Sequence, residues 1–123
     1  MVIKISSNAL ESALLGAKNN HPNEFIGLLR EKGGIITELL LAPLQVSDEN
    51  SAYFPIYAVP TDPTIIGTFH SHPSYGVPRP SIADRHLFSR HYKCHFISSL
   101  PYIPTSTRAF GNSGEPLDFS IVD

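Results

Sequence analysis

The residues best suited to chemistry lie in one stretch of the chain, at positions 70–84. His70 and His72 are separated by a single residue, and Asp84 follows at the start of a predicted helix. Imidazole nitrogens and carboxylate oxygens bind zinc at about 2.0–2.2 Å, and a catalytic zinc keeps a fourth position open for water. Three protein ligands therefore suit a catalytic site better than a closed structural one. The upstream Glu24 could then act as the base.

The two histidines come at the end of a strongly apolar segment, 65–70, that predicts a strand. Side chains two residues apart on a strand point to the same face, so both imidazoles can aim at one point, whereas Ser71 should face away. We expect Pro73 to end the strand and a proline- and glycine-rich loop to follow over 74–80. A His-x-His pair alone indicates little, because two partly exposed histidines give the same pattern.

Ser81 and Asp84 are three residues apart and share one face of a helix predicted from Ser81 to about Tyr92. The same spacing is typical of a capping box, in which the serine hydroxyl accepts from a backbone N–H and the acidic side chain reaches back to the helix start. For this pair alone, capping is the better explanation. Capping does not explain why the pair follows the two histidines so closely.

Glu24 lies in a predicted strand, 24–30, whose other residues are mostly apolar. Burying a charge without a partner is costly, so this carboxylate needs one. A half-exposed position or a salt bridge would satisfy the charge. A water molecule held at a metal site would satisfy it equally well.

The remaining elements alternate between helix and strand. A first helix should begin near Ser6, where serine can cap it, and end before His21-Pro22. A hairpin is predicted over 24–41, with its turn at Gly33-Gly34. Further extended segments are predicted at 2–5, 52–59, 94–99, 107–110 and 117–122, the last two as a closing hairpin. The pattern indicates an α/β fold, with a mixed central β-sheet flanked by two main helices.

Composition argues against several classes of protein. The 123 residues, 41% hydrophobic and 16% charged, suit one compact globular domain. A net charge of −2 without a basic block argues against nucleic acid as a partner. Cys94 is the only cysteine, which excludes an intramolecular disulfide and a four-cysteine zinc site. No apolar run approaches the roughly 20 residues that cross a bilayer, so we expect a cytoplasmic protein without membrane attachment.

Three segments taken together resemble the signature of the JAMM (MPN-plus) metalloproteases. They are 24–29, 70–73 and 81–84, with seven residues between the last two. The glutamate, both histidines, the proline, the serine and the aspartate stand at the expected positions. The resemblance covers most of the chain and implies a single MPN-like metalloprotease domain over 1–123. It also implies a minimal prokaryotic or archaeal-type member, without the insertions and appended domain of eukaryotic members.

The resemblance assigns a role to each of these side chains. It implies that His70, His72 and Asp84 hold zinc. It implies that Glu24 contacts the metal-bound water and shuttles its proton, and that Ser81 donates a hydrogen bond to the developing oxyanion. Family members typically cut amide or isopeptide bonds after the C-terminal tail of ubiquitin or a ubiquitin-like protein. Removal of an extension from a sulfur-carrier protein is a related possibility.

An extended protein tail can bind along a sheet edge by strand addition. We expect its groove beside the loop at 74–79 and the segment at 52–59, with Tyr75 and Val77 contacting the substrate. The alternative is a noncatalytic MPN-type scaffold that binds partner proteins. Scaffold members typically lose metal ligands, whereas this chain keeps all of them, so the enzyme is favoured. The resemblance predicts no particular oligomeric state.

Overall fold

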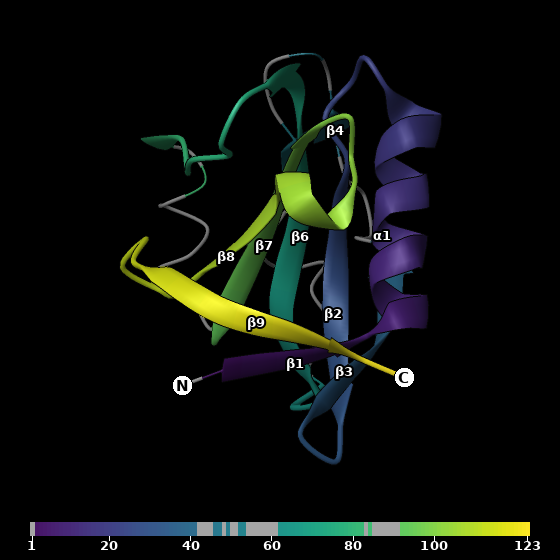
Figure 1. The fold of residues 1–123 in the computed structure, drawn as a ribbon, viewed down its shortest axis with the longest axis vertical. Coiled ribbons are helices and arrows are strands. Elements are labelled where there is room, and N and C mark those ends of the chain that lie inside the picture. Colours follow the sequence, from purple (N-terminus) through teal and green to yellow (C-terminus); the bar gives the residue numbers. More distant parts are fainter. Residues whose placement is uncertain are drawn as a thin grey trace.

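A computed structural model describes residues 2–41, 46–47, 49, 52–53, 62–82, 84 and 92–123. Its main feature is a closed barrel of strands in the order β1-β3-β2-β6-β7-β8-β9 (Figure 1). The bounds of these strands are β1 Val2–Ser6, β2 Ile26–Lys32, β3 Ile35–Leu41, β6 Ile65–Tyr75, β7 Cys94–Leu100, β8 Thr107–Phe110 and β9 Pro116–Val122. Two short strands, β4 Val46–Ser47 and β5 Ala52–Tyr53, pair separately.

The barrel mixes parallel and antiparallel pairs, as the sequence predicted. β1 lies parallel to both β3 and β9, and β6 lies parallel to β7. The other pairs, β2 with β3, β2 with β6, β7 with β8 and β8 with β9, are antiparallel. Figure 1 shows β1 and β9, from the two ends of the chain, lying side by side across the other strands. This pairing closes the barrel.

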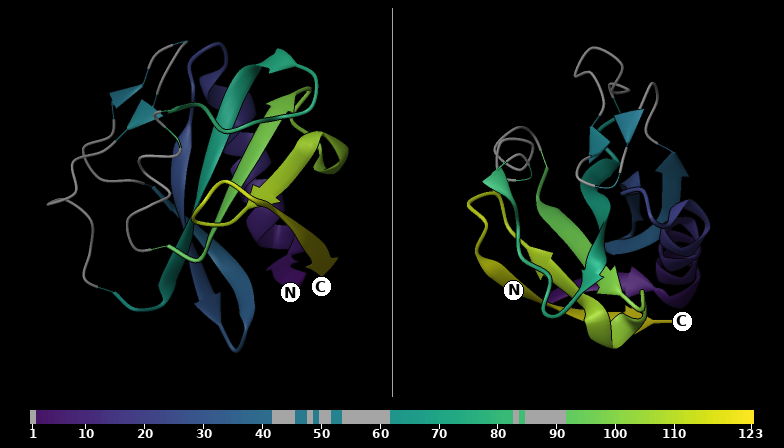
Figure 2. Two further views of the ribbon diagram at one scale, coloured as in Figure 1. Left: turned by 90° about the vertical axis from the view of Figure 1, so that its left-hand side faces the viewer. Right: turned by 90° about the horizontal axis from the view of Figure 1, so that it is seen from above.

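The helix α1, Ser7–Asn20, packs along one side of the barrel (Figure 2). The hydroxyl of Ser6 caps its start by accepting from the N–H of Ala9 at 3.1 Å. Helical spacing brings one face of α1 into the main core through Ala9, Leu10, Ala13, Leu14 and Ala17. The helix ends where expected, before Pro22. No helix in the described ranges is long and apolar enough to span a bilayer.

The prediction of two flanking helices is only partly met. Among the described residues, α1 is the one α-helix with defined bounds, and a 3₁₀ turn, η2, occupies Pro104–Ser106. The second helix was expected from Ser81 to about Tyr92. Ile82 and Asp84 have helical backbone and Tyr92 does not, whereas positions 83 and 85–91 lie outside the described residues.

Strand β6 is longer than the sequence predicted. We expected Pro73 to end it, yet β6 continues to Tyr75, paired with β7 through His72 and Ser99 and again through Tyr75 and Leu100. The register shifts between these two pairs. A bulge of this kind accommodates Pro73, because a residue without an N–H can sit where the ladder is interrupted.

The two predicted hairpins are confirmed. Gly33 and Gly34 both have positive φ, 60° and 82°, as a tight two-residue turn between β2 and β3 requires. β8 and β9 form the closing hairpin near the C-terminus. β2 begins at Ile26 rather than at residue 24, so Glu24 precedes the strand instead of lying in it. This places the carboxylate on a connecting segment between α1 and β2.

Candidate metal centre

The two histidines lie on β6 at the point where its ladder with β2 ends. His70 pairs with Ile26 of β2 on one side and with Ile97 of β7 on the other, and it is 1% exposed. His70 is also the last residue of β6 in the ladder with β2, so His72 lies just beyond it, with a side chain 17% exposed. The strand therefore presents one deep imidazole and one near the surface.

Asp84 completes a group of three potential zinc ligands. Its Oδ2 lies 3.1 Å from Nε2 of His72, and its Oδ1 lies 3.9 Å from Nε2 of His70. Two atoms that each lie about 2.1 Å from one zinc ion at the tetrahedral angle are roughly 3.4 Å apart. The two separations fall on either side of this value, so the pairing of Asp84 with each histidine fits zinc after small shifts. Within the described ranges, no group of three or more His, Cys, Asp and Glu side chains lies in a geometry that could hold a metal ion without such shifts.

The segment that carries Asp84 has the hydrogen bonds of a capping box. The N–H of Ser81 donates to Oδ2 of Asp84 at 2.8 Å, and the N–H of Asp84 donates to Oγ of Ser81 at 3.1 Å. Capping and ligation are therefore compatible here. The box fixes the carboxylate with Oδ1 directed at His70 and Oδ2 at His72.

Electrostatics keep Asp84 ionised. Its burial would raise the pKa, but the hydrogen bond from His72, the neighbouring His70 and the N–H of Ser81 together lower the pKa of this carboxyl to about 2. Burial alone would lower the pKa of His72. The hydrogen bond to Asp84 and the negative charges of Asp84 and Glu24 outweigh burial and raise this pKa above its usual value. A carboxylate charged at neutral pH is the form that binds a metal ion.

Glu24 is brought to the same place by backbone contacts of its neighbour Phe25. The N–H of Phe25 donates to Oγ of Ser71 at 2.8 Å, and the N–H of Ser71 donates to the carbonyl of Phe25 at 2.9 Å. Ser71 is fully buried. We assigned this serine no role beyond facing away from the histidines, yet it ties the Glu24 segment to the histidine strand. The sequence signal that could have indicated this contact is a small hydroxyl residue inside a buried apolar strand.

A cleft of about 540 Å³ opens over these residues. Glu24, His72 and Ser81 line it, whereas His70 and Asp84 lie buried. The sequence did not single out Arg79 and Glu49, which also line the cleft. The cleft thus combines a carboxylate, a hydroxyl and an imidazole above two buried candidate metal ligands, His70 and Asp84. This arrangement is suited to metal-assisted hydrolysis.

Tyr75 and Val77 lie on the surface near the cleft rather than in its lining. They are 79% and 65% exposed, and they follow the histidines at the end of β6 and in the loop after it. Large exposed apolar side chains of this kind are available to a binding partner. The segment 52–59 was expected to form the other side of the substrate groove, and residues 54–59 of it lie outside the described residues.

Cys94 and His95 at the start of β7 lie apart from this group. Cys94 is 0% exposed, and burial, assisted by the charge of Glu31, raises the pKa of its thiol to about 12. The thiol stays protonated at neutral pH and is unsuited to nucleophilic attack. His95 is also fully buried, with Nδ1 at 2.6 Å from Oγ1 of Thr68.

A barrel with two histidines on a central strand and an aspartate at a helix start is the architecture of the JAB/MPN proteins. Residues 6–110 match the family of prokaryotic homologs of the JAB domain. The chain therefore belongs to this prokaryotic branch of the JAMM/MPN family, as the resemblance in its sequence predicted.

Known relatives agree with this assignment. The chain is 39% identical over 132 residues to a Haloferax volcanii protein described as a probable metalloprotease, covering 99% of this chain and 81% of that relative. A JAB1/MPN domain protein from Archaeoglobus fulgidus superposes with a TM-score of 0.76 at 32% identity, covering 98% of this chain and 97% of the other. A structure described as a metalloprotease-like JAMM zinc site in the proteasome and signalosome gives 0.77 and 32%, with both chains fully covered.

Proposed function

We propose that this protein is a zinc-dependent peptidase. It cleaves the amide or isopeptide bond that follows the C-terminal tail of a ubiquitin-like or sulfur-carrier protein. The observation that carries the proposal is the convergence of His70, His72 and Asp84 beneath a cleft lined by Glu24 and Ser81. The relative described as a probable metalloprotease and the structure described as a metalloprotease-like zinc site support it.

Each side chain has a distinct task in this reaction. His70, His72 and Asp84 hold the zinc ion. When bound, zinc supplies a Lewis acid and lowers the pKa of water to about 7. Glu24, with its carboxylate in the cleft, takes the proton of the attacking water and passes it to the leaving amine.

Ser81 has a hydrogen to donate. Its oxygen already accepts from the N–H of Asp84, and a hydroxyl that accepts one bond retains its own O–H for another. Because Ser81 lines the cleft, that O–H is available to an oxyanion forming on the substrate. Loss of one such donor costs about 2.7–4 kcal/mol in other hydrolases.

The edge of β6 supports binding of an extended tail. In the described residues the ladder between β2 and β6 ends at His70, although β6 itself continues to Tyr75. Ser71 is still bonded to the carbonyl of Phe25 on this side, so an added strand would pair with the backbone of β6 beyond Ser71. Such a strand would run past the cleft, with Tyr75 and Val77 beside it.

Metal removal tests the proposed activity directly. We expect the purified protein to contain one zinc ion per chain, to cleave a ubiquitin-like fusion at its tail, and to lose cleavage after chelation. Zinc should restore it and magnesium should not, because magnesium prefers an octahedral set of oxygen ligands. Zinc content and product formed are the measurements. Cleavage that survives complete removal of metal contradicts the proposal, and binding of the fusion without cleavage by the zinc-loaded protein favours a noncatalytic scaffold.

The tail contacts can be tested with a double substitution. Replacing Tyr75 and Val77 by alanine should raise KM for a tail substrate about 30-fold, because each side chain buries apolar surface worth on the order of 1 kcal/mol and the two together are worth about 2 kcal/mol. We expect kcat to change little. The matched control replaces Val2 and Ile121, which are also exposed but lie on β1 and β9 outside the cleft lining. An unchanged KM in the Tyr75, Val77 variant would remove both residues from the binding surface.

A further inference from the structure

Tyr102 has an unusual backbone for a large residue. Its φ of 59° lies in the left-handed region, and it is the one non-glycine residue with positive φ in the described part of the chain. The side chain is only 2% exposed. The N–H of Tyr102 donates to the carbonyl of Ser99 at 2.8 Å, in the turn that leaves β7. A bulky residue keeps such a conformation only where the surrounding structure holds it, and such residues cluster at functional sites.

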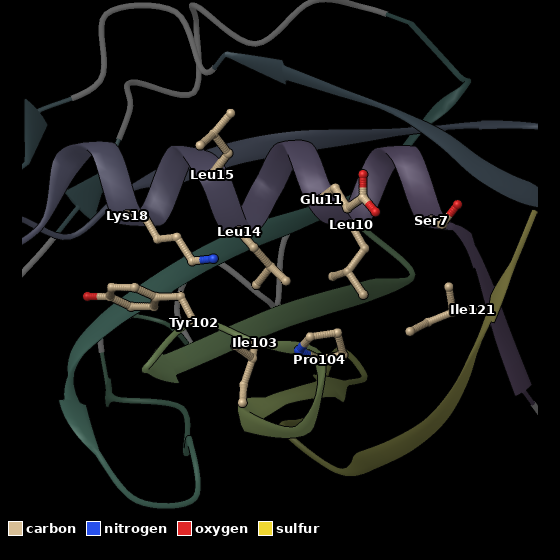
Figure 3. Close-up of a pocket in the computed structure, with 10 residues that line it drawn as sticks. All are labelled: Ser7, Leu10, Glu11, Leu14, Leu15, Lys18, Tyr102, Ile103, Pro104 and Ile121. Carbon is tan, nitrogen blue, oxygen red and sulfur yellow. The ribbon is translucent and has the colours of Figure 1, made fainter.

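The position of the Tyr102 ring is visible in Figure 3. The ring lines an apolar groove between α1 and the turn at residues 102–104, whereas the hydroxyl points away from the groove, past Lys18. There it meets the side chain of His21, with 2.9 Å between Oη and Nδ1 and the two rings edge to face at 5.7 Å. A hydroxyl fixed by a buried ring thus contacts the residue that ends α1.

His21 begins the short segment that carries Glu24 into the cleft. The N–H of His21 donates to the carbonyl of Ala17, and the N–H of Asn23 donates to the carbonyl of Asn20, at 3.0 and 2.8 Å. Beyond Glu24, the next residue is bound to Ser71 on the histidine strand. Glu24 itself belongs neither to α1 nor to β2. The contacts at the two ends of this segment therefore contribute to the position of Glu24.

The charge of Glu24 also acts on the phenol of Tyr102. Burial of the phenol raises the pKa of Tyr102, and the negative charge of Glu24 raises it further. Glu24 therefore lies within electrostatic reach of the tyrosine.

We propose that Tyr102 and His21 are positioning residues that hold the Glu24 carboxylate where it can act as the base on the attacking water. The hydrogen bond between them fixes the start of the Glu24 segment, as the bonds of Phe25 to Ser71 fix its end. This inference rests on the proposed function, in which Glu24 is the base. The consequence is catalytic, because a base displaced by a fraction of an ångström transfers protons less well although it remains present.

Two substitutions remove the hydrogen bond from opposite sides. Tyr102→Phe keeps the buried ring and deletes only the hydroxyl, and His21→Ala changes an exposed side chain. We expect each to lower kcat about tenfold at unchanged KM and zinc content, because orientation of the base is lost while binding is not. The double variant should be no slower than the slower single variant. His21→Asn, whose amide reaches the position of Nδ1, should restore most of kcat.

Two controls match these changes. Tyr92→Phe removes the hydroxyl of another buried tyrosine, and Asn20→Ala removes the bond from Nδ2 of Asn20 to the carbonyl of Gly16 at the same helix end. Both should keep full kcat. Thermal unfolding and zinc content of all variants separate positioning from general loosening of the fold.

The outcomes distinguish this inference from the proposed function. Full kcat in Tyr102→Phe and His21→Ala, in an enzyme that Glu24→Gln inactivates, overturns the inference and leaves the function intact. A loss of kcat that only follows loss of folded or zinc-loaded protein also overturns it, as does a His21→Asn variant as slow as His21→Ala. A fully active Glu24→Gln variant refutes the proposed function of Glu24, and the inference with it.

Discussion

Replacing Glu24 by glutamine should lower kcat for cleavage of a ubiquitin-like fusion by about 10²–10⁴-fold, the usual contribution of a general base. Glutamine has nearly the same shape as glutamate but cannot accept a proton at neutral pH. Glu24 lines the cleft and is only 8% exposed, so solvent does not easily take its place. Single-turnover cleavage of the fusion, followed at saturating enzyme, measures the effect on the chemical step.

Zinc should remain bound in Glu24→Gln. The predicted ligands are His70, His72 and Asp84, and the contact between His72 and Asp84 does not involve Glu24. Metal analysis of the purified variant therefore has to show one zinc ion per chain. Glu38→Gln is a suitable control, because it makes the same substitution on the exposed face of β3, where Glu38 pairs with Arg30. A Glu24→Gln variant with normal kcat would remove Glu24 as the base.

Local patterns in the sequence predicted most strands and hairpins of this fold. Gly33-Gly34 between two apolar runs specifies a tight turn, and the structure has both residues at positive φ. Closure of the barrel was not predicted. It depends on the parallel pairing of β1 with β9, in which Val2 lies opposite Asp118. No local periodicity indicates that the two ends of a chain pair with each other.

In the candidate site too, the local geometry was predicted from the sequence and the long-range contacts were not. Strand and helix geometry predicted that His70 and His72 share a face and that Ser81 and Asp84 share another, and the family resemblance implied that the two histidines and Asp84 hold one zinc ion. The supporting contacts were not predicted. Phe25 and Ser71 are 46 residues apart and His21 and Tyr102 are 81 apart, and such contacts arise only once the barrel is formed. A single polar residue in an apolar strand does not specify its partner.

The predicted extent of β6 shows a further limit. Proline usually ends a strand because it cannot donate to the ladder, and on this ground we expected β6 to stop at Pro73. The bulge between His72 and Tyr75 lets the parallel pairing with β7 resume beyond it. The longer strand changes the interpretation of Tyr75, which belongs to β6 rather than to a loop. That assignment makes strand addition beside Tyr75 a more specific hypothesis.

Replacing His72 by alanine should release the zinc ion and abolish cleavage. The affinity for zinc should fall by more than the roughly 10–100-fold that a lost outer-sphere partner costs, because a direct ligand is removed. Nε2 of His72 also lies 3.1 Å from the buried Asp84 carboxylate, so the variant loses a hydrogen bond to that carboxylate. Zinc titration with a competing chromophoric chelator measures the affinity directly.

Two further variants separate loss of metal from loss of chemistry. Ser81→Ala should keep zinc and lose about 10²–10³-fold in kcat, as expected for an oxyanion donor, whereas His21→Ala should keep zinc with only a modest loss. His72→Ala alone of the three should lose metal and activity together. If His72→Ala bound zinc as tightly as the natural chain, the ion would be held elsewhere, and the short distances from Asp84 to the two histidines would then be explained by helix capping and ion pairing alone.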